Sequence, residues 1–184
     1  GIFDSQEEQN TIPVIEKNGI RIAMLNYTYS LNGIPLPEDK RHLVTLLKWE
    51  NRDYIRSQVK QARTLADVVI VFPHWGTEYV YEPDKNQLFW TGLFAEEGVD
   101  LVIGTHPHVL EPVEWVDRPD GGKMLVFYSL GNFISGQIEA PRLLGGMANV
   151  TLTETPEGTF AITDCSVIPV VTHYSDQVGD GTYS

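Results

Sequence analysis

The sequence predicts an α/β (α+β) sandwich in which mixed β-sheets are flanked by helices. Across residues 50–128, segments with helical and with strand character alternate, which is typical of strands joined by crossover helices. On both flanks the patterns are instead those of antiparallel hairpins. Mixed sheets are therefore expected in place of a purely parallel, doubly wound fold.

The first flank is a predicted hairpin. Pro13–Ile15 and Ile20–Tyr29 have strand character, and the dipeptide Asn18-Gly19 between them suits the positive φ angles of a tight turn. Residues 31–42 contain two prolines, a glycine and mixed charge. They are expected to form a surface loop, either at the mouth of a site or as a plain connection.

The middle of the chain begins with an amphipathic helix. Between residues 50 and 67, apolar side chains recur at the spacing of one helix face, namely at Ile55, Val59, Ala62 and Ala66. The continuous β-branched run Val68–Phe72 follows directly and predicts a strand buried on both faces.

A second helix and two further strands follow. Asp84 and Gln87 form a capping-box pattern that begins a helix over residues 88–97. Apolar runs at residues 100–104 and 124–128 predict two more buried strands. The middle therefore contributes three strands and two helices.

The second flank is a predicted hairpin of residues 147–155 and 159–172, joined at Pro156-Glu157-Gly158. No internal repeat or composition break divides the chain. Residues 1–184 are therefore predicted to form a single domain.

Composition excludes several functional classes. A net charge of -12 and a pI near 4.7 oppose a broad, sequence-independent grip on nucleic acid. No apolar run approaches the ~18 residues of a membrane span, so no span is expected in this chain. Cys165 is the only cysteine, which excludes an intrachain disulfide and a multi-cysteine zinc site.

Three of the five histidines fall at the ends of predicted buried strands: His74 after the first, His106 and His108 after the second. Ligands of open α/β sheets gather beyond the carboxyl ends of strands, and neutral imidazole is a good ligand for zinc, manganese or iron. Each histidine alone could be an ordinary loop residue, but the three together predict a convergent metal site. His42 and His173 lack this context and are expected on the surface.

Glu78 and Asn132 are candidates for contacting substrate or orienting a ligand. The Glu78 carboxylate could accept a hydrogen bond from a ligating histidine, take a proton, or be solvated on a loop. Asn132, in the turn after the third buried strand, could be a positive-φ turn residue or offer its amide to a substrate oxygen. The three alternatives for Glu78 and the two for Asn132 all stay open.

Four stretches, in this order and spacing, resemble one known family. They are GIRIAMLNYT at 19–28, HWGTEY at 74–79, DLVIGTHPHVLEPVEW at 100–115 and YSLGNF at 128–133. They resemble the bacterial capsule-synthesis CapA family, also called the poly-γ-glutamate synthesis (PGA_cap) family, of the calcineurin-like metallophosphoesterase superfamily. Any one stretch would be weak, whereas the combination is specific.

The resemblance implies a metallophosphoesterase-like sandwich that holds two divalent ions (Mn, Zn or Fe) at strand ends, where they activate water and clamp a phosphoryl oxygen. By motif, His74 resembles the isolated histidine ligand of the superfamily, and His106 and His108 resemble its paired histidines. The resemblance also implies a place on the outer side of the bacterial cell envelope, with an N-terminal membrane anchor.

One departure from the family pattern affects the expected activity. The superfamily's first ligands come from aspartate, asparagine and histidine motifs near the N-terminus, and no such motif precedes His74. The chain is therefore expected to be the C-terminal portion of a larger domain, missing an N-terminal segment and the carboxylate that bridges two ions. By itself it is expected to bind metal weakly and to be a poor catalyst.

Two functions remain in competition. The first is capsule biosynthesis with a hydrolytic dinuclear metal site that acts on a phosphoester or on an anionic capsule polymer. The second is a non-catalytic component that binds, retains or exports that polymer. The charge of -12 disfavours broad polyanion binding unless local cations such as Arg41, Arg52 and Arg56 offset it, which favours the enzyme.

Overall fold

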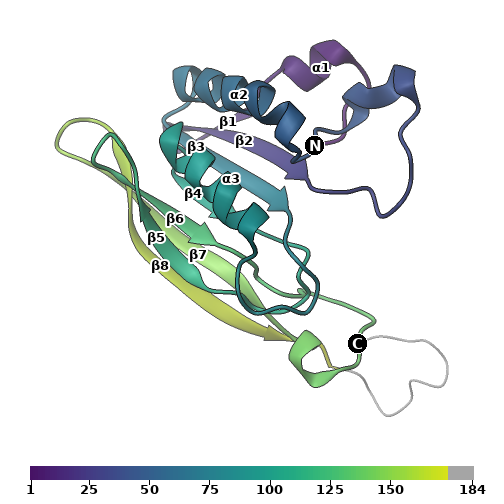
Figure 1. Ribbon diagram of the computed structural model, residues 1–184. Coiled ribbons are helices and arrows are strands. Elements are labelled where there is room, and N and C mark those ends of the chain that lie inside the picture. The colour runs from purple at the N-terminus through teal and green to yellow at the C-terminus, as the bar shows by residue number, and fades with distance from the viewer. Residues whose placement is uncertain (174–184) are drawn as a thin grey trace.

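The computed structural model describes residues 1–173 and shows a mixed six-stranded sheet with a separate two-stranded sheet beside it (Figure 1). The larger sheet has the strand order β1-β2-β3-β4-β6-β5, and β7 pairs with β8. The strands are β1 Val14–Lys17, β2 Ile20–Thr28, β3 Val68–His74, β4 Leu101–Ile103, β5 Val113–Asp117, β6 Lys123–Phe127, β7 Leu144–Glu154 and β8 Phe160–Val171. The predicted fold class, an α/β sandwich with mixed sheets, is confirmed.

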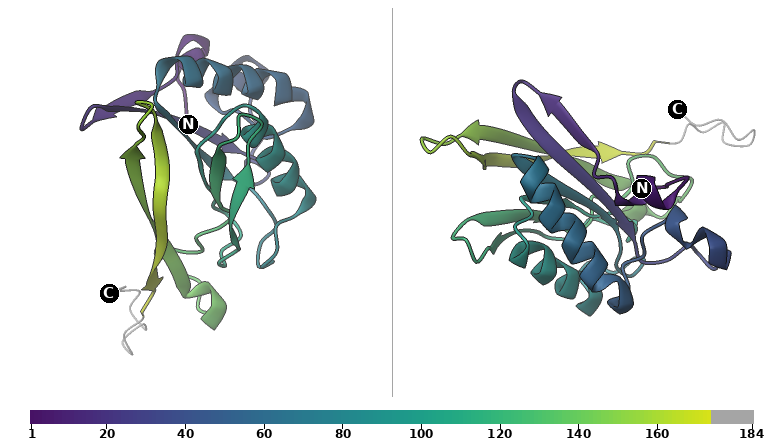
Figure 2. Two further views of the ribbon diagram at one scale, coloured as in Figure 1. Left: turned by 90° about the vertical axis from the view of Figure 1, so that its left-hand side faces the viewer. Right: turned by 90° about the horizontal axis from the view of Figure 1, so that it is seen from above.

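Helices and the small sheet cover opposite faces of the large sheet (Figure 2). On one face lie α2 (Arg52–Leu65) and α3 (Lys85–Glu96), whose side chains pack on β2, β3 and β4 in the main core. On the other face, β7 and β8 pack on a second core formed by Leu101, Leu125 and Phe127. Within residues 1–173 no helix is both long and apolar enough to cross a bilayer.

The sheet topology places four strand ends on one rim. β2, β3, β4 and β6 run parallel, while β1 and β5 are antiparallel strands at the two edges. In register, Thr28 at the end of β2 lies beside His74 at the end of β3. Loops that follow these strands can therefore meet at a common edge.

Several local predictions are confirmed. Asn18 and Gly19 have φ angles of 54° and 79° in the first hairpin turn. Asp84 caps α3 in a complete capping box with Gln87. The β7–β8 hairpin also forms, with its turn at Gly158 in the left-handed region.

Other elements were not expected. β5 has one half-buried residue and four exposed ones, so it lacks the alternation that marks a half-buried strand. The short helix α1 (Gln6–Asn10) lies in a segment predicted only as polar. α2 begins at Arg52, preceded by the 3₁₀ turn η2 (Trp49–Asn51), and two more 3₁₀ turns form at η1 (Glu38–Leu43) and η3 (Ala140–Arg142).

Gly104, directly after β4, allows a close contact between the residues that follow β3 and β6, the two strands that flank β4. The Trp75 indole N–H donates to the Tyr128 carbonyl oxygen at 2.9 Å. A Cβ at residue 104 would overlap that same oxygen and the indole nitrogen. Only glycine fits here without moving buried backbone.

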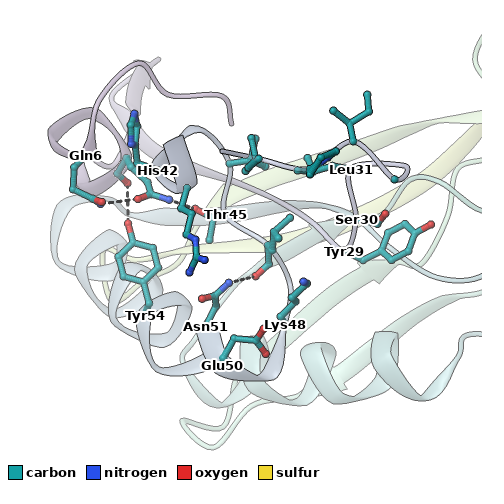
Figure 3. Close-up of a pocket in the computed structure, with 18 residues that line it drawn as sticks. Gln6, Tyr29, Ser30, Leu31, His42, Thr45, Lys48, Glu50, Asn51 and Tyr54 are labelled. Carbon is teal, nitrogen blue, oxygen red and sulfur yellow. Dashed lines mark hydrogen bonds between the residues drawn. The ribbon is translucent and has the colours of Figure 1, made fainter. Parts of the chain in front are cut away.

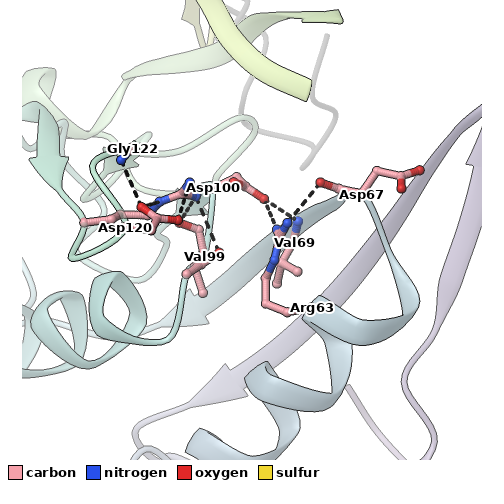
Figure 4. A network of polar contacts seen from close by, with 9 residues as sticks. Arg63, Asp67, Val69, Val99, Asp100, Asp120 and Gly122 are labelled. Carbon is pink, nitrogen blue, oxygen red and sulfur yellow. Dashed lines mark hydrogen bonds and ion pairs between the residues drawn. The ribbon is translucent and has the colours of Figure 1, made fainter. Parts of the chain in front are cut away.

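The rim opposite the histidines is joined by an ionic network around Asp100 (Figure 4). The Asp100 carboxylate accepts hydrogen bonds from Arg63 of α2 and from Arg118, which follows β5, and from the Val69 backbone N–H at 2.8 Å. The carboxylate is only 12% exposed, so its charge depends on these donors. The network ties a helix, β3, β4 and the β5–β6 connection together at the amino ends of the parallel strands.

Candidate metal centre

The three histidines predicted as metal ligands lie together at the carboxyl-end rim. The ring centroids of His74 and His106 are 4.5 Å apart, and those of His106 and His108 are 6.0 Å apart. The convergence is as predicted, while the role of the three rings as metal ligands stays a prediction.

A carboxylate completes the cluster. One ligand atom each from Glu78, His106 and His108 lies within 4.8 Å of the others. Glu78 was expected to contact substrate or to act behind a ligand, but this position also lets it be a ligand. Its side chain is exposed, whereas His106 is buried and His108 half-buried. The cluster therefore opens to solvent on the Glu78 side.

The backbone at this site is unusual. His106 and His108 have φ angles of 108° and 61°, and Tyr79 has a φ of 66°. A non-glycine residue in the left-handed region costs on the order of 1–3 kcal/mol and persists only where its surroundings fix it. Pro107, whose ring restricts the residue before it, lies between the two histidines. The turn around Pro107 therefore has a backbone conformation that the sequence did not reveal.

Thr28 selects the tautomer of His74. The Thr28 hydroxyl donates to the Ser30 carbonyl oxygen at 2.9 Å, so its single proton is used. His74 Nδ1 lies 3.0 Å from the same hydroxyl and must therefore be the donor. The Nε2 atom of His74 then carries the lone pair, which is the state that a metal ligand requires.

Asn132 likewise selects the tautomer of His108. Its amide N–H groups donate to the Arg142 carbonyl at 2.9 Å and to Gln137 Oε1 at 3.2 Å, which orients the amide. The Asn132 Oδ1 atom can only accept, and it lies 2.8 Å from His108 Nδ1. His108 therefore also presents a free Nε2. Asn132 thus lies beside a candidate ligand, and its role there stays a prediction. The alternative that it is a positive-φ turn residue is wrong, because the positive φ of this turn is at Gly131 (64°).

The surroundings keep two of the imidazoles neutral. Burial lowers the pKa of His74 below its usual value, and the neighbouring His108 lowers it further. Burial also lowers the pKa of His106, and His74 adds to that effect. The Glu78 carboxylate acts against both shifts. Near neutral pH both rings therefore have lone pairs to offer.

Two aromatic side chains, which the sequence did not point to, pack around the cluster. Tyr29, just after β2, lies over His106 at 4.7 Å and over His74 at 5.8 Å between ring centroids. Tyr79 stacks on His108 at 5.9 Å, and the Arg142 guanidinium lies 3.6 Å from the Tyr79 ring centroid. Tyr29 follows a strand end just as the histidines do, so the same reasoning could have found it. Nothing local marks Arg142.

Solved structures share this architecture. A putative 5'-nucleotidase from Staphylococcus aureus aligns over 92% of this chain and 32% of its own, with a TM-score of 0.56 at 13% identity. The sulfate thiohydrolase SoxB from Thermus thermophilus aligns over 87% of this chain and 24% of its own, with a TM-score of 0.52 at 17% identity. At such identities the likeness concerns the fold alone, which is metallophosphoesterase-like.

Curated relatives and a family profile are more specific. The PGA biosynthesis protein CapA of Bacillus subtilis (strain 168) is 30% identical over 165 residues, which are 90% of this chain and 41% of that protein. The capsule biosynthesis protein CapA of Bacillus anthracis is 32% identical over 126 residues, 65% of this chain and 28% of that protein. The chain thus spans less than half the length of either relative. Residues 1–137 match the family profile described as "Bacterial capsule synthesis protein PGA_cap", and the chain therefore belongs to this family.

Proposed function

We propose that this protein is a metal-dependent hydrolase of capsule synthesis, and that its cluster of His74, His106, His108 and Glu78 binds divalent metal. The observation that carries the proposal is the meeting of three imidazoles and one carboxylate at a single rim. The capsule role is that of the family to which the chain belongs. The cellular place proposed for it is the outer side of the bacterial envelope.

The donor set fits a transition-metal ion. Imidazole nitrogen and carboxylate oxygen suit Mn²⁺, Zn²⁺ and Fe²⁺, and hydrogen bonds to Thr28 and Asn132 leave Nε2 of His74 and His108 free. When bound, such an ion lowers the pKa of a coordinated water and polarises the oxygen of a substrate. Because Glu78 adds one negative charge, the cluster offsets more of the positive charge of a bound ion than three neutral histidines would.

The chain's own residues hold and enclose this site. Thr28 and Asn132 fix two ring orientations, and Tyr29 and Tyr79 pack on the rings from the side. Such outer contacts keep ligands within the narrow tolerance that hydrolysis needs. The proposed substrates are a phosphoester or a bond of the anionic capsule polymer.

The test combines metal analysis with turnover. Bound manganese and zinc, cleavage of a generic phosphate ester and shortening of the capsule polymer are measured for wild type, His106→Ala and His108→Ala. His173→Ala, a replacement of an exposed histidine, is the matched control. We expect loss of metal and of turnover only in the two cluster variants.

The measurement is made on this chain and on the protein at its full natural length. We expect full turnover only at full length, because one carboxylate offsets little of the repulsion between two cations. Polymer binding without any metal-dependent turnover at full length would refute the hydrolase and would support the polymer-binding or export role.

A further inference from the structure

A cavity of about 900 Å³ lies next to the histidine cluster (Figure 3). It is bounded by α1, by the connection of residues 31–48 and by the start of α2. Tyr29 and Ser30 lie at one end of it, and Gln6 and Tyr54 lie at the other. Because Tyr29 also packs on His74 and His106, the cavity and the candidate metal centre share a wall.

The charges of this cavity oppose those of the whole molecule. The chain has a net charge of -12, yet two cations, Arg41 and Lys48, line the cavity against a single carboxylate, Glu50. Within residues 1–173 the Lys48 ammonium makes no ion pair. Among the described residues Arg41 forms an ion pair with Glu38 alone, at 3.5 Å with both side chains largely exposed, and such a pair is weak.

Two other arginines, Arg52 and Arg56, are already engaged by neighbouring side chains. Arg52 lies over the Trp49 ring and pairs with Asp53 at 3.3 Å. Arg56 pairs with Glu96 and Glu97, each at 2.7 Å. Of these three arginines, Arg41 at the cavity is therefore the one whose pairing is weakest, and Lys48 beside it adds a second positive group.

The remaining wall combines apolar and polar groups. Leu31, Ile34 and Leu36 supply hydrocarbon surface, and Ser30 supplies a hydroxyl. His42, which was expected on the surface, is half-buried here. A ligand that alternates methylene groups with carboxylates would match both kinds of wall, and the volume is large enough for several units of a polymer.

We infer that this cavity is the subsite for the acidic groups of the capsule polymer next to the bond that reacts, with Arg41 and Lys48 contacting its carboxylates. The inference rests on the proposed function, since it assigns the substrate of that same site. Of the two alternatives for residues 31–42, it selects a loop at the mouth of a site.

Binding is measured by calorimetry with metal chelated, so that no hydrolysis is needed. The probes are a short oligomer of γ-linked glutamate and an uncharged γ-linked glutamine oligomer of equal length. We expect only the acidic oligomer to bind, with an affinity that falls as salt is added. Arg41→Gln and Lys48→Gln should each weaken binding about two- to fivefold, and the double variant on the order of tenfold.

Lys17→Gln is the control, because Lys17 lies at the β1–β2 turn, at the other end of β2 from the cavity. It removes the same charge and should bind like wild type. Thermal midpoints of all variants should be equal, since the replaced side chains are exposed.

The outcomes separate this inference from the proposed function. Equal binding of the neutral oligomer, or wild-type affinity in the double variant, overturns the subsite even if metal-dependent turnover of a phosphate ester persists. Charge-dependent binding without any turnover at full length would support the subsite and refute the proposal that the protein is a hydrolase.

Discussion

Replacing Asn132 by alanine tests whether a hydrogen bond behind a histidine controls metal binding. The side-chain amide joins three segments: it accepts from His108 Nδ1 at 2.8 Å and donates to the Arg142 carbonyl and to Gln137. Alanine removes all three contacts. His108 then loses the partner that fixes its tautomer and ring orientation.

Two magnitudes follow from these contacts. Loss of the partner behind a ligating histidine typically weakens metal binding about 10- to 100-fold. Loss of the two amide donor bonds costs roughly 0.5–1.5 kcal/mol each, or about 1–3 kcal/mol of the free energy of unfolding. In a domain of this size that lowers the thermal midpoint by several degrees. Asn132→Ala should therefore reduce both metal affinity and stability.

Asn132→Asp separates these two effects. Aspartate keeps an oxygen that accepts from His108 Nδ1 but, like alanine, has no amide to donate to Arg142. Both variants should lose stability, aspartate the more because its second carboxylate oxygen would face the Arg142 carbonyl oxygen, while only alanine should lose metal affinity. Asn149→Ala is the control, because Asn149 is part of the β7–β8 hairpin and its amide donates only to the exposed Ser166 hydroxyl.

The assay is titration of Mn²⁺ into the folded protein at full natural length, followed by calorimetry, together with thermal melts. If folded Asn132→Ala binds Mn²⁺ as tightly as wild type, Asn132 does not position a ligand. Its amide would then serve only to hold the Arg142 and Gln137 segments in place.

Three further predictions concern stability and are tested by thermal and denaturant unfolding. Gly104→Ala should cost more than about 3 kcal/mol because its Cβ overlaps backbone, whereas Gly92→Ala, with nothing within 4 Å, should gain about 0.5–1 kcal/mol. Asp100→Asn should cost about 1.5–3 kcal/mol, because it removes the charged acceptor of Arg63 and Arg118 while Arg118 keeps its pair with Asp120; Lys123→Gln, which breaks an exposed pair, should cost less than about 1 kcal/mol. Burial raises the pKa of Glu111 from 4.5 to about 7, so the folded state keeps a proton that the unfolded state loses, and stability falls as pH rises between these values. Glu111→Gln should therefore melt higher than wild type above pH 7 and show no such gain below pH 4.5; equal melting curves above pH 7 would contradict this.

Secondary-structure elements that depend on residues close together in the sequence could be predicted from it. The apolar stripe of α2, the capping box of Asp84 and Gln87, and the turn at Asn18-Gly19 all depend on residues a few positions apart. The edge strand β5 could not be predicted, because its side chains are largely exposed and only pairing with β6 makes it a strand. Pairing partners distant in sequence leave no periodic signal.

In the candidate site, too, some features could be predicted from the sequence and others could not. The sequence alone determined that His74, His106 and His108 follow buried strands, and that parallel strands end at one rim, so their meeting could be foreseen. Only the tertiary structure decided that His106 and His108 take left-handed backbone angles, because surrounding contacts must offset that cost. It also decided that Arg142 lies on Tyr79 and that Asn132 holds His108. These contacts join segments dozens of residues apart, and their geometry depends on how all the intervening chain packs, which no short window of sequence contains.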